Sequence, residues 1–361
     1  MPEQTRKRYI EFDILRAAAI MLLPLIHLYE ELHDQGLLTS MTSQSQHWIL
    51  YLCVYAPSVF MLCFGANLIF AREKTPVEYA KRGVRFLLIG VSLSAVRFVF
   101  PALIAELCGK QGEIVKSIET LFYSDIYDFV GAFLLLYALF KKLKLSDFTM
   151  LMIAFAMMFV NTYFSGISTD NKWLDSFLGR FIYINKDSYF PLLSWTMFPI
   201  LGIYVGKIYQ SIQEKDRGQI MMKCLIGSLF ADGLIYITLK SYGLSYFKIA
   251  VSVSNEYKTD FINVIILLLI FAKLLPIAYC LVVKFSQSRP IQWLLSISSV
   301  IMAFYVIQWV IIAWLENILV YAQLTEKISV GLFYVIFAGV MILTLVLTKL
   351  FGKKLQAFLN K

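Results

Sequence analysis

Strong ionisable side chains stand inside an otherwise apolar stretch near the start of the chain. Asp13, Arg16 and His27 fall within residues 10–29, and Glu30 follows directly. Each such group in a membrane span costs at least about 2 to 3 kcal/mol on insertion scales, so its presence marks a functional site by default. An imidazole titrates near neutral pH and therefore suits proton transfer. These four residues are the first candidates for chemistry.

The spacing of these residues places them on one helix face. Arg16 and His27 are eleven residues apart, and eleven steps of about 100° return to within roughly 20° of the starting direction. The helical rise separates them by about 16 Å along the axis, with Asp13 one turn before Arg16 and Glu30 about one turn after His27. One polar stripe is therefore expected to run from the cytoplasmic boundary to the outer half of the bilayer.

The composition of the chain indicates that this helix is one of many membrane spans. Of the 361 residues, 59% are apolar and 16% are charged, whereas soluble domains carry about 25% charged residues. Ten apolar runs are long enough to cross a bilayer. They cover residues 10–29, 48–71, 84–105, 118–140, 147–167, 190–210, 220–240, 261–284, 292–320 and 328–350. The ninth run is long enough to be tilted or broken near residues 296–299.

The distribution of Lys and Arg predicts the orientation. If the basic start of the chain is cytoplasmic, twenty Lys and Arg fall in cytoplasmic segments and nine in outer loops, which is a clear positive-inside bias. The net charge of +9 follows mostly from this bias and needs no nucleic acid, and attraction to anionic lipid is its side effect. The expected partner is the lipid bilayer. We therefore expect an all-α integral membrane protein, with residues 1–361 forming one domain. About ten transmembrane helices would form one bundle, both termini would be cytoplasmic, and the loop 168–189 would lie outside.

Basic residues in or beside later runs are candidates for binding an anion. Arg82 and Arg85 lie at i and i+3 on one helix face, and paired guanidiniums suit the phosphates of a nucleotide or of coenzyme A. The alternative is that this pair belongs only to the positive-inside pattern. Lys273 lies near the midpoint of the eighth run, so we expect it to face the bundle interior. There it could bind coenzyme A, pair with an acidic residue or have a purely structural role, and the sequence does not decide among these.

Polar and small residues in other runs predict contacts between helices. Arg97 lies in the third run, and we expect it to pair with a carboxylate of the first run or with Asp125 near the outer end of the fourth. Gln308 and Glu316 are buried polar candidates in the ninth run. The sixth run contains Gly202-Ile-Tyr-Val-Gly206, a small-xxx-small pattern that packs helices closely.

Several known chemistries lack their sequence motifs. The five cysteines are odd in number and show no C-x-x-C spacing, which indicates neither a disulfide framework nor a zinc site. The chain has no Walker phosphate loop, no G-x-G-x-x-G and no H-E-x-x-H. We therefore expect no metal, and the case for an enzyme depends on polar groups inside the spans.

Four segments of the chain carry a family resemblance. Asp13-x-x-Arg16, followed ten intervening residues later by His27, resembles the first-span signature of the membrane acyltransferases. The main branches of these proteins are the acyltransferase-3 family and the heparan-α-glucosaminide N-acetyltransferase-like proteins. Arg82-x-x-Arg85 resembles the cytoplasmic arginine pair of the first branch. Residues 125–145 and 190–206 resemble the second branch, so the branch stays open.

The resemblance implies an enzyme that carries an acyl group, usually acetyl, from cytoplasmic acetyl-CoA to a sugar hydroxyl or amine outside. His27 would be the general base, with Arg16 oriented by Asp13, and a covalent acyl-histidine is the alternative to direct transfer. The residues expected to bind acetyl-CoA are Arg82, Arg85 and Lys273. The residues expected to bind a glycan or glycolipid acceptor are Glu30, Asp125 and Trp195. The protein would lie in the plasma membrane as a multi-pass protein, and a homodimer is possible.

A proton-coupled secondary transporter is the rival interpretation, because spans with buried Asp, Arg, His and Lys also describe such carriers. Carriers commonly contain internal repeats, and no repeat is visible among the ten runs. The absence of a repeat and the spacing of Arg16 and His27 favour the acyltransferase.

Overall fold

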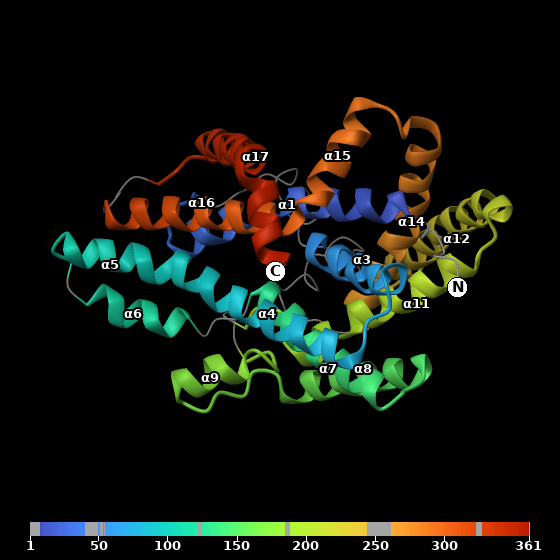
Figure 1. The fold of residues 1–361 in the computed structure, drawn as a ribbon, viewed down its shortest axis with the longest axis horizontal. Helices are drawn as coiled ribbons and strands as arrows, with labels where there is room; N and C mark the ends of the chain where they lie inside the picture. The colour runs from blue at the N-terminus through green and yellow to red at the C-terminus, as the bar shows by residue number, and fades with distance from the viewer. Residues whose placement is uncertain are drawn as a thin grey trace.

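The computed structural model describes residues 8–39, 50, 53, 55–110, 112–121, 125–184, 188–243, 261–322 and 327–360. The described residues form packed helices, and their only β-structure is one isolated bridge between Leu38 and Ile328 (Figure 1). The predicted all-α fold is confirmed.

Eight helical segments of the described residues are long and apolar enough to cross a membrane. They are α1 (Ile10–Asp34), α4 (Pro76–Ser94) continued by η1 (Ala95–Val99) and α5 (Phe100–Leu107), α8 (Asp147–Phe164), α10 (Leu192–Trp195) with α11 (Met197–Ser211), α12 (Glu214–Ser241), α14 (Phe261–Phe285), α16 (Ile301–Tyr321) and α17 (Val330–Asn360). The chain is a multi-pass membrane protein.

Each of the ten predicted runs overlaps a helix. The second run contains α3 (Ala56–Phe70) and the fourth contains α7 (Ile126–Lys142), which have 15 and 17 residues and are shorter than a usual span. Residues 48, 49, 51, 52 and 54 of the second run lie outside the described residues. The remaining described helices are three shorter ones: α6 (Glu113–Thr120), α9 (Lys172–Leu178) and α15 (Arg289–Ser299).

The predicted break in the ninth run is confirmed. α15 ends at Ser299 and α16 begins at Ile301, because Val300 between them leaves the helical backbone region at φ −124° and ψ 30°. The break turns the chain just before α16 and points Ser298 toward α1. This turn decides which residues meet the polar stripe of α1.

α1 is the central helix of the bundle. In its most apolar stretch 72% of the residues are buried, compared with 11% in α12. α1 packs against α3, α14, α15, α16 and α17, whereas α12 packs chiefly against α14. The polar residues of α1 therefore face other helices, while most of α12 faces outward.

Close packing fixes α3 against α11. A Cβ atom added to Gly202 would lie 2.0 Å from the carbonyl oxygen of Leu62, and one added to Gly65 would lie 2.0 Å from that of Pro199. Neither position accepts a side chain, because backbone occupies the space. The predicted role of the Gly202-x-x-x-Gly206 pattern in helix packing is confirmed.

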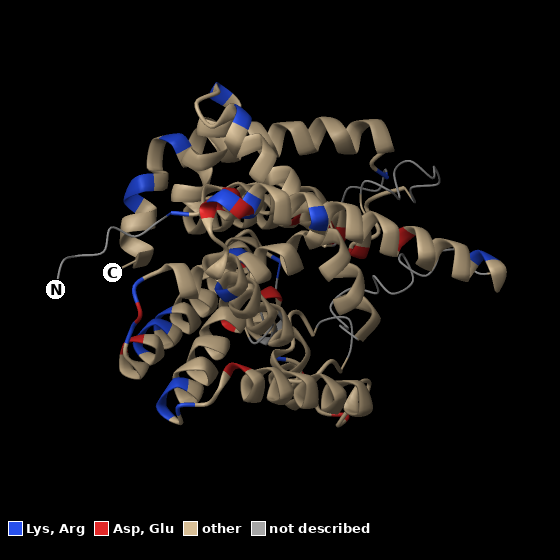
Figure 2. Ribbon diagram, turned by 90° about the vertical axis from the view of Figure 1, so that its right-hand side faces the viewer, with Lys and Arg blue, Asp and Glu red and all other residues tan. Residues whose placement is uncertain are grey.

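Basic residues gather at one end of the bundle. Figure 2 shows most of the Lys and Arg positions, in blue, at the end where α1 begins and α17 finishes. This distribution supports the predicted orientation, in which that end is cytoplasmic. We call it the inner end and the opposite end the outer end.

Candidate active site

The inner end of the polar stripe is an ion-pair cluster around Asp13. Its Oδ2 accepts from Arg8 Nε at 2.5 Å, and its Oδ1 accepts from Arg16 Nη2 at 3.1 Å and from Ser298 Oγ at 3.2 Å. Arg16 Nη2 also donates to Ser298 Oγ at 3.0 Å. The predicted pairing of Asp13 with Arg16 is confirmed. Ser298 was not predicted, because only the break before α16 brings it there.

A cavity of about 550 Å³, the inner cavity, opens beside this cluster. Its charged wall residues are three arginines and one aspartate: Arg8, Arg16, Arg82 and Asp13. The remaining wall residues are apolar, aromatic or neutral polar, among them Tyr127 and Tyr305. An excess of guanidinium groups in a partly apolar cavity suits a ligand with both phosphate and apolar parts.

The three basic residues predicted to bind the cofactor have different positions. Arg82 lies in the inner cavity wall. Arg85 donates from Nη1 to the backbone oxygen of Asn360 at 2.6 Å, and Asn360 is itself a wall residue. Lys273 pairs with Asp232 of α12, and neither cavity described here includes it in its wall. The predicted position in the bundle interior is wrong, because Lys273 pairs with an acid of α12, a helix at the edge of the bundle.

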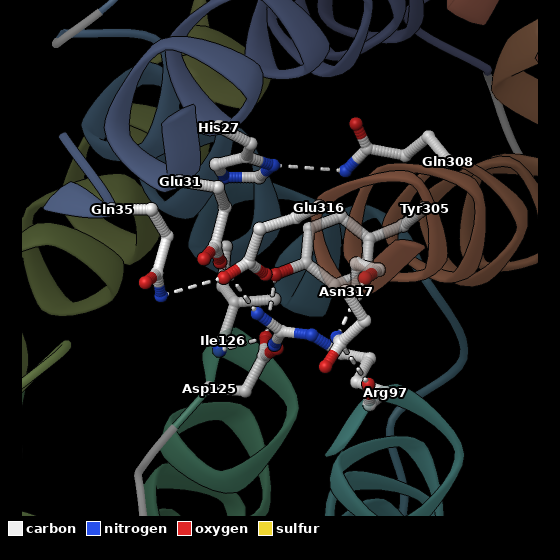
Figure 3. Close-up of polar contacts among 11 residues, drawn as sticks. His27, Glu31, Gln35, Arg97, Asp125, Ile126, Tyr305, Gln308, Glu316 and Asn317 are labelled. Carbon is white, nitrogen blue, oxygen red and sulfur yellow. Dashed lines mark hydrogen bonds and ion pairs between the residues drawn. The ribbon is translucent and has the colours of Figure 1, made fainter. Parts of the chain in front are cut away.

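His27 lies further along α1 in an aromatic setting (Figure 3). Its Nδ1 is 3.0 Å from Gln308 Nε2. Its ring stacks on Trp309, with centroids 4.0 Å apart and planes at 18°, and the Tyr305 ring meets it edge-on at 6.1 Å. The imidazole is 2% exposed, so three residues of α16 fix its position.

Arg97 joins three helices near His27. It donates from Nη1 to Asp125 Oδ2 at 2.9 Å and from Nη2 to Glu31 Oε1 at 3.3 Å, and its guanidinium lies 3.5 Å from the Trp309 ring centroid. Asp125 is confirmed as a partner, and the partner on the first helix is Glu31, two residues beyond the predicted first run. Arg97 lies in the π-helical turn η1, and such turns often occur at functional sites. Figure 3 shows Arg97 and the carboxylates of Glu31, Asp125 and Glu316 converging on one region.

Asp125 is held by the start of its own helix as well as by Arg97. It is the N-cap of α7, and Asp128 completes a capping box with it. Its Oδ1 accepts a 2.5 Å hydrogen bond from the hydroxyl of Tyr305. The carboxylate is therefore rigid, charge-compensated and only 5% exposed.

A second cavity, the outer cavity, has a volume of about 380 Å³. Its wall includes His27, Glu30, Arg97 and Asp125. Tyr305 belongs to the walls of both the inner and the outer cavity. The two cavities thus lie on either side of one tyrosine, next to the ends of the polar stripe of α1.

Trp195 takes a different place from Glu30 and Asp125. It is 4% exposed, and it packs against Phe129, Phe190 and Phe198 with ring centroids 4.6 to 6.3 Å apart. Of this aromatic group only Phe190 belongs to the outer cavity wall. Trp195 therefore supports the wall from behind instead of forming it.

Tyr305 and Trp309 of α16 contact His27 but were not among the predicted site residues. Together with Gln308 they lie at i, i+3 and i+4, which places them on one helix face. Buried Gln308 and Glu316, at 0% and 6% exposure, confirm the prediction that they are buried. The i, i+4 pair of large aromatics beside a buried amide was the sequence signal for this face.

No cluster of three His, Cys, Asp or Glu side chains that could hold a metal occurs among the described residues.

The family described as "Heparan-alpha-glucosaminide N-acetyltransferase, catalytic" matches residues 8–240. This stretch is more than half of the chain and contains Asp13, Arg16, His27, Arg97 and Asp125. The chain belongs to this family. It is a membrane acetyltransferase by family, which confirms the resemblance seen in the first span. Ser298, Tyr305 and Gln308 lie beyond the matched residues. No curated protein and no solved structure matches the chain.

Proposed function

We propose that this protein transfers an acetyl group from cytoplasmic acetyl-CoA, bound in the inner cavity, to a sugar hydroxyl or amine in the outer cavity. The observation that carries the proposal is Tyr305, which belongs to both cavity walls. A long, flexible pantetheine arm can follow α1 past Asp13 and Arg16 toward His27, while the nucleotide stays at the inner end. We further propose that the protein works in the plasma membrane.

The donor end supports this proposal through its charge. Arg8, Arg16 and Arg82 face one cavity in which Asp13 is the only carboxylate, and phosphates are well matched to guanidinium groups. Asp13 bonds to Arg8 and Arg16 and thus fixes both side chains. Arg85 helps to hold Asn360 at the cavity wall.

His27 acts as the general base. The acceptor hydroxyl or amine attacks the thioester carbonyl carbon, and His27 takes the proton that the attacking atom loses. The new bond from the acceptor to the carbonyl forms as the carbon–sulfur bond breaks. The imidazolium then returns the proton to the leaving thiolate, which gives free coenzyme A. Atoms and charge balance without a metal or a redox partner.

The acceptor end offers carboxylates to bind hydroxyl or ammonium groups. Glu30 and Asp125 lie in the outer cavity wall beside His27. Because the family is described by transfer to a glucosaminide nitrogen, an amino sugar is the first acceptor to test. A glycan or glycolipid would present such a group from the outer side.

The test uses the purified full-length protein in detergent and in proteoliposomes. We expect acetyl-CoA to bind, and we expect acetylated product with glucosamine or with a glycoside that carries it. Glucose, which lacks the amine, separates O-transfer from N-transfer. Proton-coupled uptake of the sugar without acetylation would instead support a transporter, and failure to bind acetyl-CoA would contradict the proposal.

A further inference from the structure

We infer that Gln308 is a positioning residue that selects the productive tautomer of His27. The inference rests on the proposed function, since it presupposes that His27 is the base. Gln308 lies on α16, outside the residues matched by the family. The structure gives His27 one hydrogen-bond partner among the described residues, and that partner is the side-chain amide of Gln308.

The contact is buried and geometrically fixed. His27 is 2% exposed and Gln308 is 0% exposed. The ring stacks on Trp309 at 4.0 Å and meets Tyr305 edge-on, so it cannot tilt out of this plane without losing both contacts. In this position Nδ1 faces Gln308. The second nitrogen, Nε2, lies on the side of the ring away from Gln308 (Figure 3), and His27 forms part of the outer cavity wall.

The orientation of the amide decides which nitrogen carries the proton. With Nε2 of Gln308 toward the ring, Nδ1 must accept, and the proton of the neutral imidazole is on the cavity side. The lone pair that a base needs is then unavailable to the acceptor. With Oε1 toward the ring, Nδ1–H donates, and Nε2 of His27 presents its lone pair to the cavity. Oxygen and nitrogen of an amide exchange places by a half-turn of the group.

Protonation of His27 favours the second orientation during catalysis. In the first orientation Oε1 of Gln308 has no hydrogen-bond partner among the described residues, so a half-turn of the amide breaks only the contact with Nδ1. After His27 has taken a proton both ring nitrogens are donors, so only the oxygen can face Nδ1. Gln308 thus stabilises the imidazolium by a half-turn of its amide, and it keeps Nε2 as the nitrogen that receives the proton.

Other charged and titratable groups surround this pair, and any pH profile reports them together. They come from α1, η1, α7 and α16: Glu31, Arg97, Asp125, Tyr305 and Glu316. The experiment therefore compares variants at position 308 while all of these groups are kept.

The test measures kcat against pH for Gln308→Met and Gln308→Glu. Met fills a similar volume without a hydrogen bond, so we expect kcat to fall by about tenfold or more, with unchanged acetyl-CoA affinity. A carboxylate can only accept, so Gln308→Glu should retain turnover. It should move the acidic limb of the profile to higher pH, because the negative charge favours the imidazolium.

A matched control is Asn161→Leu, which removes another fully buried amide, in α8. It should lower thermal stability without moving the pH profile. Equal kcat values and equal pH profiles for the wild type and both Gln308 variants would overturn the inference. Loss of acetyl-CoA binding in both Gln308 variants would also overturn it, because that loss indicates a structural role of Gln308. Failure of the proposed function would give a different result: full turnover in His27→Ala would show that His27 is not the general base.

Discussion

The hydroxyl of Tyr305 donates a 2.5 Å hydrogen bond to Oδ1 of Asp125, and this contact joins α16 to the start of α7 between the two cavities. Both residues are buried, at 3% and 5% exposure. Arg97 binds the other oxygen of the same carboxylate. The wall between the inner and outer cavities therefore depends on a charged hydrogen bond as well as on packing.

Replacing Tyr305 with Phe removes this hydrogen bond and keeps the ring. We expect the free energy of unfolding to fall by about 1.5 to 3 kcal/mol, the usual range for a hydrogen bond to a charged group. Tyr127→Phe is a matched control, because the Tyr127 hydroxyl donates to the neutral carbonyl of Met302 at 2.8 Å and should cost only about 0.5 to 1.5 kcal/mol. Thermal unfolding in detergent measures both. A smaller loss for Tyr305→Phe than for Tyr127→Phe would contradict the expectation.

His27→Ala separates catalysis from structure. The variant should insert, remain folded and bind acetyl-CoA through the inner cavity, while transfer falls by about 10²- to 10⁴-fold for the loss of a general base. Binding, thermal stability and turnover should be measured on one purified sample. Near-normal turnover in a folded His27→Ala protein would rule out the mechanism, and a joint loss of stability and cofactor binding would indicate a structural histidine.

Arg82→Ala tests the proposed phosphate site. Loss of one charge-assisted contact should weaken acetyl-CoA binding by about 1.5 kcal/mol or more, which is roughly tenfold. Turnover at saturating acetyl-CoA should survive. Lys273→Met is the control, because Lys273 pairs with Asp232 and lies in the wall of neither cavity described here, so it should leave the affinity unchanged. Equal affinities for wild type and Arg82→Ala would leave Arg82 with a role in topology only.

The orientation can be tested with two introduced cysteines in a background without the exposed Cys108, Cys224 and Cys280. Ile167 is 54% exposed after α8, and Ser211 is exposed at the end of α11. In intact cells an impermeant thiol reagent should label Ile167→Cys and leave Ser211→Cys unlabelled. The opposite pattern would invert the proposed path of the acetyl group.

Acid should loosen the outer loop through Asp175. Hydrogen bonds from Ser168 and Thr169 lower the pKa of this carboxyl below its ordinary value. Because the pKa is lowered in the folded state, the ionised carboxylate stabilises the loop fully above its unfolded-state pKa of about 3.9. This stabilisation is lost as the pH falls through the folded-state pKa. The protection of backbone amides near Thr169 from hydrogen exchange, taken relative to the unfolded chain at the same pH, should therefore fall at low pH, and Asp175→Asn should lower it already at neutral pH. Asp170→Asn is the control, and equal protection in both variants would contradict this role of Asp175.

The sequence alone determined the features that depend on a single segment. Length and hydropathy were enough to predict a helix within each of the ten runs, because a bilayer requires long apolar helices with internally satisfied backbones. The orientation of Arg16 by Asp13, which the family resemblance implied, agrees with their i, i+3 spacing, because that spacing brings two side chains together within one helix. The break near residues 296–299 followed from the excessive length of the ninth run.

Only the tertiary structure decided which distant residues share the site. Spacing along one helix cannot determine the rotation and depth of its neighbours, since these depend on how side chains of both helices pack. The structure brought Ser298 to Asp13 across 285 positions and Gln308 to His27 across 281 positions. It likewise placed Arg8 in the inner cavity and Lys273 beside Asp232, although both are basic residues near or within apolar runs. The burial of Trp195 behind Phe190 has the same cause: a motif fixes the order of residues, whereas helix packing fixes which of them face a cavity.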